Sequence, residues 1–530
     1  MELREYQNNI INTAKEKNTL VILPTGLGKT LIAFELIKYM LEKRRGKAIF
    51  LAPTKPLVDQ HFSNFKKNYQ FETHILTGSI NPGKRKEIFE KAEVILATPQ
   101  TVANDMKNNL INLYNVCIII FDEAHRCLKN YDYVYIAKKY VEENKSGRIV
   151  GLTASPSEEK AKIDQICHNL NISAIEIRTR ESPDVKPYIK KLKVKIIKTK
   201  IDDELEEIRK NLKEYYEKKL EELKNRGFLF KPIVSKKDII ELQRTLQRKV
   251  AIDKNYNLLK AMTAIAVALK IQHALELLET QSISALYLYL QDLYEQAQEK
   301  KSKAVCEIIR NGNFNKAFLK TVELYKKGRE HPKLEKLKEI LQEELKNNKN
   351  FRAIVFTQYR DNVAKISDVL SSFGIKNKPF VGQAKKRDFG LNQKIQREII
   401  EEFKLGLINV LVSTSVGEEG LDLPEVDTVI FYEPVPSAIR KIQRAGRTAR
   451  TREGRVIILM TEKTRDESYY WAAWHKEHKM YNIINSLSKK LKLKEPKQTV
   501  EKTKAKTLHD FFNADIEIEE ENTNQTNQNE

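Results

Sequence analysis

Short runs of β-branched and other apolar residues, each followed by an amphipathic stretch, recur in two separate parts of this 530-residue chain. The run Cys117–Phe121 is typical of the first part, and Ala353–Phe356 of the second. A strand that is apolar on both faces suits a parallel sheet buried between two layers of helices. The pattern therefore predicts two α/β domains with parallel sheets, over residues 1–185 and 331–488.

The sequence between these two blocks has a different texture. No Gly or Pro occurs from Ile233 to Asn311, and apolar residues recur there at helical spacing among Lys and Glu. This predicts an all-α inserted domain over residues 186–330. From residue 489 the chain is first Lys-rich, then acidic, and finally rich in Asn and Gln, which predicts a flexible tail over 489–530.

Positive charge is concentrated in the predicted insert. The chain has 94 Lys and Arg against 72 Asp and Glu, and the span from Lys186 to Glu330 holds 32 basic and 20 acidic residues. Such a field attracts polyanions, of which nucleic acid is the commonest inside a cell. The alternative is a solvated helical surface that is merely rich in Lys.

Membrane and secreted proteins are not expected from this composition. The most apolar stretch, Ala261–Leu278, is interrupted by Lys270, His273 and Glu276, so no membrane partner is predicted. The chain starts with charged residues and has only four cysteines, without CxxC spacing. These features predict a cytoplasmic protein in a reducing compartment.

A phosphate-binding loop is predicted at Leu23–Thr30. The sequence Leu-Pro-Thr-Gly-Leu-Gly-Lys-Thr follows a predicted strand and opens an apolar helix. Gly26 and Gly28 allow backbone N–H groups to face phosphates, Lys29 reaches the β and γ oxygens, and Thr30 suits Mg²⁺. The first position is Leu23 where this motif has Gly, so a chance match is the alternative.

Two carboxylates, Asp122 and Glu123, follow the buried run Cys117–Phe121. Carboxylates at the end of a buried strand are costly unless a cation or a proton-transfer role stabilises them. Asp122 suits Mg²⁺, through water, and Glu123 suits activation of an attacking water. The alternative reading is that Asp122 caps a helix.

A third motif, Gln443–Arg450, contains two arginines three residues apart. On a helix Arg447 and Arg450 share a face and direct two guanidinium groups toward one anion. Such donors suit a phosphoryl group in transfer, although a surface basic patch is the commoner explanation of one such motif alone.

In order along the chain, these motifs resemble the motif series of superfamily 2 helicases. The others in the series are Arg4-x-Tyr6-Gln7, Ala52–Lys55, Thr77-Gly78, Ala97–Gln100, Thr153–Ser155, Phe356–Gln358 and Ser413–Asp422. The resemblance is closest to archaeal Hef helicases and their eukaryotic Fanconi-anaemia M relatives, with RIG-I-like RNA sensors next. It implies two RecA-like domains flanking the insert, which would grip a nucleic-acid duplex.

The resemblance also implies roles for individual residues, with ATP and Mg²⁺ as cofactors and forked or branched DNA as the partner. Catalysis falls to Lys29, Asp122, Glu123, Gln443, Arg447 and Arg450, and magnesium binding to Thr30 and Asp122. Nucleotide contacts fall to Arg4, Gln7, Pro24, Thr25, Gly26, Leu27, Gly28, Lys29, Thr30 and Asp422. Nucleic-acid backbone contacts fall to Pro53, Thr54, Lys55, Thr77, Gly78, Thr98, Pro99, Gln358, Val381, Gly382, Gln383, Thr414 and Ser415. Thr153 and Ser155 would couple the two sites.

The predicted function is therefore an ATP-dependent DNA helicase or translocase that acts on forks during repair. The alternative from another class is an ATP-gated module that binds double-stranded RNA without unwinding it, as RIG-I-like sensors do. No nuclease motif of the Hef type follows Met460, so we expect no nuclease activity.

Two aromatic groups lie outside these motifs. Trp471 and Trp474 have helical spacing, which favours a packed core face over base stacking. In the tail, Leu508, Phe511 and Phe512 resemble the sliding-clamp-binding peptide of replication proteins, with Ala505 in place of its leading Gln. A clamp is thus a candidate partner, and docking of the tail on the motor is the alternative.

Overall fold

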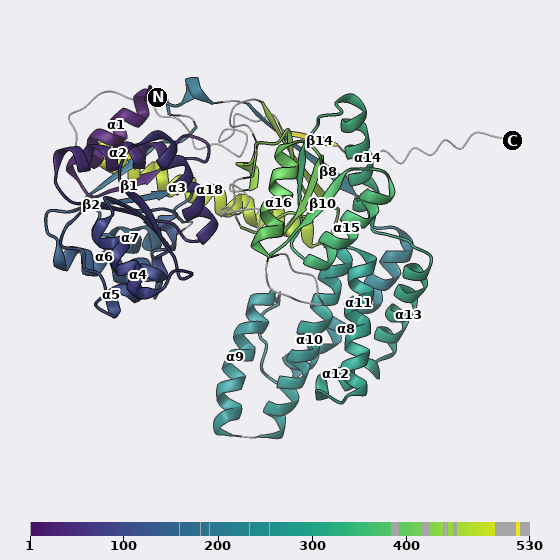
Figure 1. Cartoon of the computed structure of the whole chain (residues 1–530). Coiled ribbons are helices and arrows are strands. Elements are labelled where there is room, and N and C mark those ends of the chain that lie inside the picture. Colours follow the sequence, from purple (N-terminus) through teal and green to yellow (C-terminus); the bar gives the residue numbers. More distant parts are fainter. Residues whose placement is uncertain are drawn as a thin grey trace.

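The computed structural model contains two seven-stranded parallel sheets and a helical bundle (Figure 1). It describes residues 2–157, 159–180, 182–189, 191–232, 234–253, 255–382, 392–414, 423–437, 440, 444–448, 453–492 and 516–519. The predicted fold class, two RecA-like α/β domains with an all-α insert, is confirmed.

The first sheet has the strand order β3-β4-β2-β5-β6-β1-β7, and all its neighbouring strands are parallel. Its elements, in chain order, are α1 (Glu5–Glu16), β1 (Thr19–Ile22), α2 (Lys29–Lys43), β2 (Lys47–Leu51), α3 (Lys55–Asn68), β3 (Thr73–Leu76), α4 (Pro82–Lys91), β4 (Val94–Ala97), α5 (Pro99–Lys107), β5 (Val116–Phe121), the 3₁₀ turn η1 (Ala124–Arg126), α6 (Asp132–Glu143), β6 (Arg148–Thr153), α7 (Lys160–Asn169), β7 (Ala174–Ile177) and the 3₁₀ turn η2 (Lys186–Tyr188).

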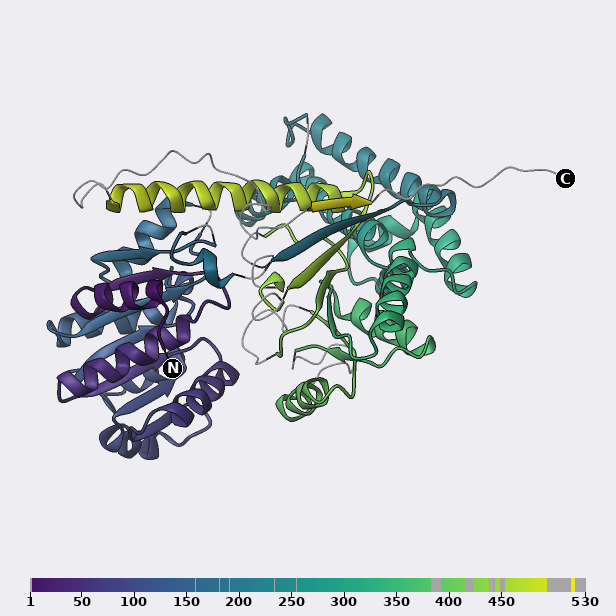
Figure 2. The same cartoon turned by 90° about the horizontal axis from the view of Figure 1, so that it is seen from above.

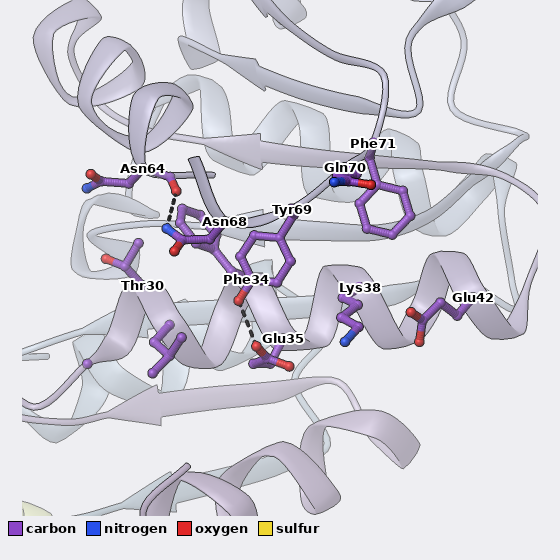
Figure 3. Close-up of a pocket in the computed structure, with 12 residues that line it drawn as sticks. Thr30, Phe34, Glu35, Lys38, Glu42, Asn64, Asn68, Tyr69, Gln70 and Phe71 are labelled. Atoms are coloured by element: carbon purple, nitrogen blue, oxygen red, sulfur yellow. Dashed lines mark hydrogen bonds between the residues drawn. The ribbon is translucent and has the colours of Figure 1, made fainter. Parts of the chain in front are cut away.

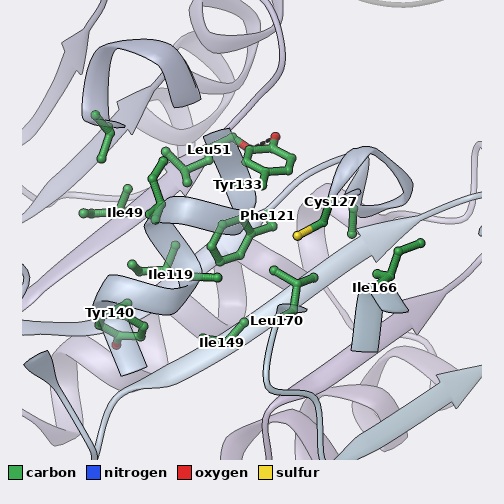
Figure 4. Packing of buried hydrophobic residues seen from close by; sticks show 14 of the residues in the cluster. Ile49, Leu51, Ile119, Phe121, Cys127, Tyr133, Tyr140, Ile149, Ile166 and Leu170 are labelled. Carbon is green, nitrogen blue, oxygen red and sulfur yellow. Dashed lines mark hydrogen bonds between the residues drawn. The ribbon is translucent and has the colours of Figure 1, made fainter. Parts of the chain in front are cut away.

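Alternate residues of the central strands fill two separate cores, one on each face of this sheet. On β5, Ile119 and Phe121 belong to one core, while Ile118 and Ile120 belong to the other, and all four side chains are fully buried. Figure 4 shows the first of these cores, where Tyr133 of α6 meets the ring of Phe121 edge-on at 5.1 Å. This arrangement explains why the sequence runs are apolar without alternation.

The helical insert spans Asp203 to Lys326. It consists of α8 (Asp203–Asn225), α9 (Lys236–Ile252), α10 (Tyr256–Thr280), α11 (Ile283–Gln298), α12 (Lys303–Ile309) and α13 (Gly312–Lys326). By length and composition α10 is one helix that would suit a membrane span, but 67% of its apolar window is buried inside the protein. The helix is the centre of the bundle core, which it shares with α8 and α11.

The second sheet has the order β10-β11-β9-β12-β13-β8-β14 and is also parallel throughout. Its elements are β8 (Leu192–Thr199), α14 (Pro332–Asn347), β9 (Ala353–Phe356), α15 (Arg360–Ser372), β10 (Asn377–Phe380), α16 (Gln393–Lys404), β11 (Val410–Ser413), β12 (Thr428–Phe431), β13 (Gly454–Thr461), α18 (Arg465–Lys492) and β14 (Ile516–Glu519).

Two predicted domain boundaries differ from this topology. Residues 192–199 form β8 inside the second sheet, whereas the sequence analysis assigned them to the insert beginning at 186. Their alternation of Lys with apolar residues is a strand pattern, since Leu192, Val194 and Ile196 are buried while Lys193 is exposed. Similarly, α18 continues to Lys492, and β14 pairs with β8 within the predicted flexible tail.

The insert is fixed to the second domain through the last turn of α10. One carboxylate oxygen of Glu276 accepts hydrogen bonds from the hydroxyls of Tyr359 (3.2 Å) and Tyr469 (3.0 Å). The side-chain oxygen of Gln281 accepts one from the hydroxyl of Thr357, at 3.2 Å. The insert therefore contacts the Phe356–Gln358 motif of the second domain directly.

Helix α18 connects the two α/β domains. Figure 2 shows it as a long helix that extends from the second domain over the first. Tyr470 near its start packs in a core of the second domain, whereas Met480, Ile484 and Leu487 pack in a core of the first. Because this buried face is a single helical stripe, the helix links the two domains through apolar contacts.

The prediction that both tryptophans pack in a core is wrong for Trp471. This side chain is 53% exposed, because it lies about 100° around α18 from the buried Tyr470. Trp474 is half-buried and stacks on His478 with the ring centroids 4.2 Å apart.

Candidate nucleotide and nucleic-acid site

The phosphate loop follows β1 and ends at the first residue of α2, as predicted. Gly26 and Gly28 have φ of 81° and 80°, in the left-handed region that favours glycine. The ammonium of Lys29 donates to the carbonyl oxygens of Leu23 (2.9 Å) and Pro24 (3.3 Å), so this side chain lies across the loop. The N-terminus of α2, which is the positive end of the helix dipole, completes an anion cradle.

Residues of α1 hold this loop from the other side. The Tyr6 hydroxyl (2.9 Å) and the Gln7 amide (3.3 Å) both donate to the carbonyl oxygen of Leu27. The guanidinium of Arg4 donates to the Tyr6 hydroxyl at 3.1 Å. A Cβ at Gly28 would lie 2.4 Å from the amide nitrogen of Gln7, and the φ of +80° would strain any residue with a side chain at this position. Of the predicted nucleotide-binding residues, Gln7 therefore contacts the phosphate loop directly, and Arg4 contacts it through Tyr6.

Asp122 lies directly after β5 and is 8% exposed. One of its carboxylate oxygens is 3.3 Å from Nε2 of His61, and its carbonyl oxygen accepts a 2.7 Å hydrogen bond from the hydroxyl of Tyr133. Burial raises the pKa of this tyrosine well above its usual value, so the hydroxyl stays a donor. These contacts fix the carboxylate at the carboxyl edge of the sheet.

Glu123 has φ of 50°, which is strained for a residue with a side chain. Its carboxylate is 3.2 Å from Nδ1 of His125, and the same nitrogen is 3.3 Å from the hydroxyl oxygen of Thr153. That oxygen in turn accepts the backbone N–H of Ser155 at 3.3 Å. A chain of polar contacts therefore runs from Glu123 through His125 to the Thr153–Ser155 motif, and its first link is a close approach without a hydrogen bond, since Oε2 of Glu123 has no hydrogen-bond partner among the described residues.

The loops that follow β1, β5 and β6 meet at one edge of the sheet. The backbone N–H of Leu23, which starts the phosphate loop, donates to the carbonyl oxygen of Thr153 at 3.0 Å. Thr30 and Asp122 supply a hydroxyl and a carboxylate, the oxygen ligands that Mg²⁺ takes together with phosphates and water. Among the described residues no group of three or more acidic, His or Cys side chains is placed to hold a metal ion.

A cavity of about 760 Å³ adjoins the phosphate loop (Figure 3). Its lining includes Gly28 and Thr30 and continues along α2 to Glu35, whose carboxylate accepts a 2.7 Å hydrogen bond from the Tyr69 hydroxyl. Burial raises the pKa of Tyr69, and the hydrogen bond to Glu35 raises it further. Neither Asp122 nor Glu123 is among the residues that line this cavity.

The predicted nucleic-acid contacts of the first domain form two groups. Lys55 and Thr77 both contact the hydroxyl of Ser79, at 3.3 and 3.0 Å, and Gly78 has open space around it. The buried hydroxyl of Thr54 makes no hydrogen bond among the described residues. Pro53, the preceding residue, is buried. In the second group the hydroxyls of Thr98 and Thr101 form a hydrogen bond at the start of α5, where Pro99 is buried.

In the second domain, the described contacts come from loops after β9, β10 and β11. Gln358 is exposed, and its N–H donates to the buried carboxylate of Glu433. Val381 is fully buried in the core, so any contact it makes with a ligand comes from its main chain; Gly382 follows it, half-buried. Thr414 is 5% exposed and donates its N–H to Phe380 at 3.4 Å.

Arg447 lies in a short turn. Its backbone N–H donates to the carbonyl oxygen of Arg444 at 3.1 Å. The guanidinium of Arg444 is buried over the rings of Phe356 (4.9 Å) and Phe431 (5.8 Å). The remaining predicted site residues lie outside the described part of the chain and stay predictions: Gln383, Ser415, Asp422, Gln443, Arg450, Leu508, Phe511 and Phe512.

The sequence motifs did not predict the contribution of several residues near the site. Tyr6 lies inside a motif but contributes through a hydrogen bond to the loop, and His61 and Tyr133 come from α3 and α6. Glu433 was missed as well. Burial raises its pKa to about 8, despite the nearby charges of Lys333 and Arg444. A carboxylate after an apolar strand, as at Asp122, is the signal that identifies Glu433.

Comparison with known families covers most of the chain. Residues 1–158 match the family "Type III restriction enzyme, res subunit", residues 204–328 match "Putative ATP-dependent RNA helicase, helical bundle", and residues 332–452 match "Helicase conserved C-terminal domain". The crystal structure of the Pyrococcus furiosus Hef helicase domain superposes with a TM-score of 0.69 at 46% identity, over 89% of this chain and 98% of that one.

Curated relatives are similar over nearly the whole of this chain. A Methanocaldococcus jannaschii protein named "Putative ATP-dependent RNA helicase MJ1505" is 40% identical over 92% of the chain and 61% of its own length. The Fanconi anemia group M protein homolog of Mus musculus is 32% identical over 93% of the chain and 26% of its own length. The Schizosaccharomyces pombe ATP-dependent DNA helicase fml1 is 32% identical over 91% of the chain and 59% of its own length. The chain thus spans between a quarter and three fifths of these relatives.

Proposed function

Because this chain belongs to the superfamily 2 helicases, in the family of the Hef helicase domain, we propose that it is an ATP-dependent translocase of forked or branched DNA. Its role would be the repair of replication forks inside the cell. The observation that carries the proposal is the polar chain from Glu123 to Ser155, which joins a hydrolytic carboxylate to a loop next to the predicted strand contacts.

The residues of the first domain suit hydrolysis of a nucleoside triphosphate. Lys29 and the N-terminus of α2 bind phosphates, and Glu123 accepts a proton from the attacking water. Mg²⁺ bound with ATP would supply charge neutralisation between the phosphate oxygens, and Thr30 and Asp122 are the residues that would hold it. Arg447 would reach the nucleotide from the second domain, so that ATP closes the cleft between the domains.

Hydrolysis would be coupled to movement along one strand. When the proton on His125 or the position of Glu123 changes, the hydroxyl of Thr153 is the next group to respond, and the backbone of Ser155 follows. Lys55, Thr77 and Ser79 would bind the strand through phosphates, without reading bases. Sequence-independent translocation follows from contacts of this kind.

The proposal is tested by displacement of a labelled strand from a synthetic fork, with ATP and with a non-hydrolysable analogue. We expect displacement or branch migration only with ATP, and none by Glu123→Gln. A chain that binds forks equally well under both conditions and moves no strand would contradict the proposal.

The second candidate is an ATP-gated module that binds double-stranded RNA. The M. jannaschii relative and the family that matches the insert are both named as putative ATP-dependent RNA helicases, which favours this candidate. The relatives named as DNA helicases, together with the Hef domain, favour DNA. An RNA module would bind duplex RNA more tightly with ATP and displace no DNA strand.

We also propose that the segment around Leu508, Phe511 and Phe512 binds a sliding clamp. The support is the sequence pattern alone, in which one helical turn brings Leu508 and Phe511 to one face. A peptide of residues 503–514 titrated against the clamp is the test. Binding that survives Phe511→Ala with Phe512→Ala, or no binding at all, would contradict it.

A further inference from the structure

Glu433 is a buried carboxyl group at the carboxyl edge of the second sheet. It lies two residues after Phe431, the last residue of β12, much as Asp122 follows β5 in the first sheet. The side chain is 1% exposed, and its Oε2 atom has no hydrogen-bond partner among the described residues. Burying a carboxyl group is unfavourable unless it is paired or hydrogen-bonded, so its neighbours should show what it does.

On one side Glu433 holds the main chain of Gln358. Strands β9 and β12 are parallel, with Phe356 opposite Phe431, and the N–H of Tyr432 donates to the carbonyl oxygen of Phe356 at 3.0 Å. Just beyond this bond, the N–H of Gln358 donates to Oε1 of Glu433 instead of to a main-chain oxygen. The carboxyl group therefore fixes the main chain of an exposed residue that is a predicted strand contact.

On its other side Glu433 faces the short turn from Arg444 to Arg447, which we call the arginine turn. The guanidinium of Arg444 is buried over the rings of Phe356 and Phe431, the last residues of β9 and β12. The carbonyl oxygen of Arg444 accepts the N–H of Arg447, which is a predicted nucleotide contact. One carboxyl group thus lies between a predicted strand contact and a predicted nucleotide contact.

Two cations act on the carboxyl group of Glu433, and they are held differently. Burial raises its pKa to about 8, an effect that the nearby charge of Asp466 reinforces, and the charges of Lys333 and Arg444 oppose this rise. Lys333 is fully buried and donates to Asp466 at 2.7 Å and to the carbonyl oxygen of Thr280 at 2.8 Å, so it belongs to the fixed core. Arg444 belongs instead to the arginine turn, and would shift with that turn when a nucleotide binds.

A group that only ended the strand ladder would need no charge. The N–H of Gln358 requires a neutral oxygen acceptor, and an amide supplies one with a smaller penalty for burial. A carboxyl group differs because it accepts a hydrogen bond more strongly when it is charged, and a nearby cation favours the charged form. A movement of Arg444 is therefore transmitted to the hydrogen bond that holds Gln358.

We propose that Glu433 is a positioning residue that couples the arginine turn to the strand contact at Gln358. A nucleotide that draws the arginine turn toward its phosphates moves the charge of Arg444 relative to Glu433, and the main chain at Gln358 adjusts to the strength of its hydrogen bond. The inference rests on the proposed function, which places Arg447 at ATP and Gln358 at a nucleic-acid strand. It gives the second domain a link between ATP and the strand that is separate from the polar contacts of the first domain.

The test measures the affinity of the whole chain for labelled forked DNA, with and without a non-hydrolysable ATP analogue. In the unmodified chain the analogue should change this affinity at least about fivefold, the lower end of ordinary coupling between two sites. Glu433→Gln should keep the affinity without the analogue within about twofold, because its amide oxygen still accepts the N–H of Gln358. It should lose the effect of the analogue, because an amide cannot become charged. Glu433→Ala should also weaken binding without the analogue, by about tenfold, since the N–H loses its acceptor.

A second readout follows from the reciprocity of coupled binding, and a purely structural role would not change it. Forked DNA must change the affinity for the ATP analogue by the same factor by which the analogue changes the affinity for DNA. Both factors should be close to one in Glu433→Gln. The matched control is Glu453→Gln, an exposed carboxyl group directly before β13, which should keep both factors of the unmodified chain.

The outcomes separate this inference from the proposed function. If Glu433→Gln keeps both factors of the unmodified chain, Glu433 only ends the strand ladder and the inference is wrong. This comparison stands even if Glu433→Ala does not fold, because glutamine matches glutamate in volume. If the unmodified chain binds no forked DNA, or binds it equally with and without the analogue, the proposed function fails, and not this inference alone.

Discussion

At the scale of single residues, the phosphate loop and the two acidic residues after β5 were predictable because each motif stands in a strand–loop–helix context. The contacts that these residues make in the fold were not predictable from the sequence. The amide of Gln7 lies where a Cβ of residue 28 would be, and the left-handed φ of Glu123 has no counterpart in residue type. Both depend on atoms brought together by the fold. Val381 is a further example, because its position in a motif did not indicate that its side chain is buried in the core of the second domain.

The central residues make separable predictions. Lys29→Ala removes the phosphate donor, and Glu123→Gln removes the proton acceptor while keeping the shape of the side chain. We expect ATP turnover to fall at least about 100-fold in each. Only Glu123→Gln should keep its affinity for a fluorescent ATP analogue, because the phosphate cradle is intact. Turnover close to that of the unmodified chain in either variant would contradict the site assignment.

At the scale of elements, the contact that matters most is the last turn of α10 against the second domain. Burial alone would raise the pKa of Glu276. The nearby imidazole of His273, hydrogen bonds from Lys236 and Tyr469, and the charge of Lys236 together outweigh burial and lower the pKa to about 2. The ordinary value is 4.5, so folding favours the charged form and the contact is stabilising in the neutral range.

This contact predicts a defined pH dependence. The stabilisation is complete above about pH 4.5 and is lost as the pH falls toward 2, because the unfolded chain binds the proton first. Glu276→Gln should therefore cost about 3 kcal/mol at pH 7 and flatten the loss of stability in acid. Chemical denaturation at pH 7 and pH 3, followed by the fluorescence of Trp471 and Trp474, measures both effects.

The matched control for this experiment is Glu241→Gln, an exposed carboxylate of α9. It should leave the stability at both pH values unchanged. Equal behaviour of the Glu276 and Glu241 variants would show that the α10 contact contributes nothing to stability.

At the scale of the whole molecule, the sequence predicted the two α/β domains and the insert from hydrophobic pattern alone. It did not predict that β8, which precedes the insert, joins the second sheet, because its partner β13 lies far along the chain, although residues 192–199 themselves alternate as a strand does. Nor did it predict that α18 returns to the first domain. Pairings of that kind join residues hundreds of positions apart, and local patterns carry no information about them.

Helix α18 should therefore determine how firmly the two domains are joined. Met480 and Ile484 are 1% and 2% exposed in the core of the first domain, whereas the interdomain ion pair between Arg397 and Asp59, at 2.5 Å, has one exposed partner. Buried apolar groups contribute far more than a surface ion pair. Met480→Ala with Ile484→Ala should lower the stability of the first domain by several kcal/mol, about 2 to 5 per side chain.

Calorimetry checks this, since we expect the unfolding of the first domain to separate from that of the second in the double variant. Asn482→Ala, an exposed residue of the same helix, is the control. Arg397→Ala should have little effect. If the double variant unfolds like the control, α18 does not hold the domains together.

The central claim is that this chain is an ATP-driven motor on branched DNA, and the most direct measurement is its ATPase rate with forked DNA, linear duplex DNA and duplex RNA side by side. The proposed function predicts that forked DNA stimulates hydrolysis most strongly, linear DNA less, and RNA least. Equal or stronger stimulation by duplex RNA, or no stimulation by any of the three, would contradict the account.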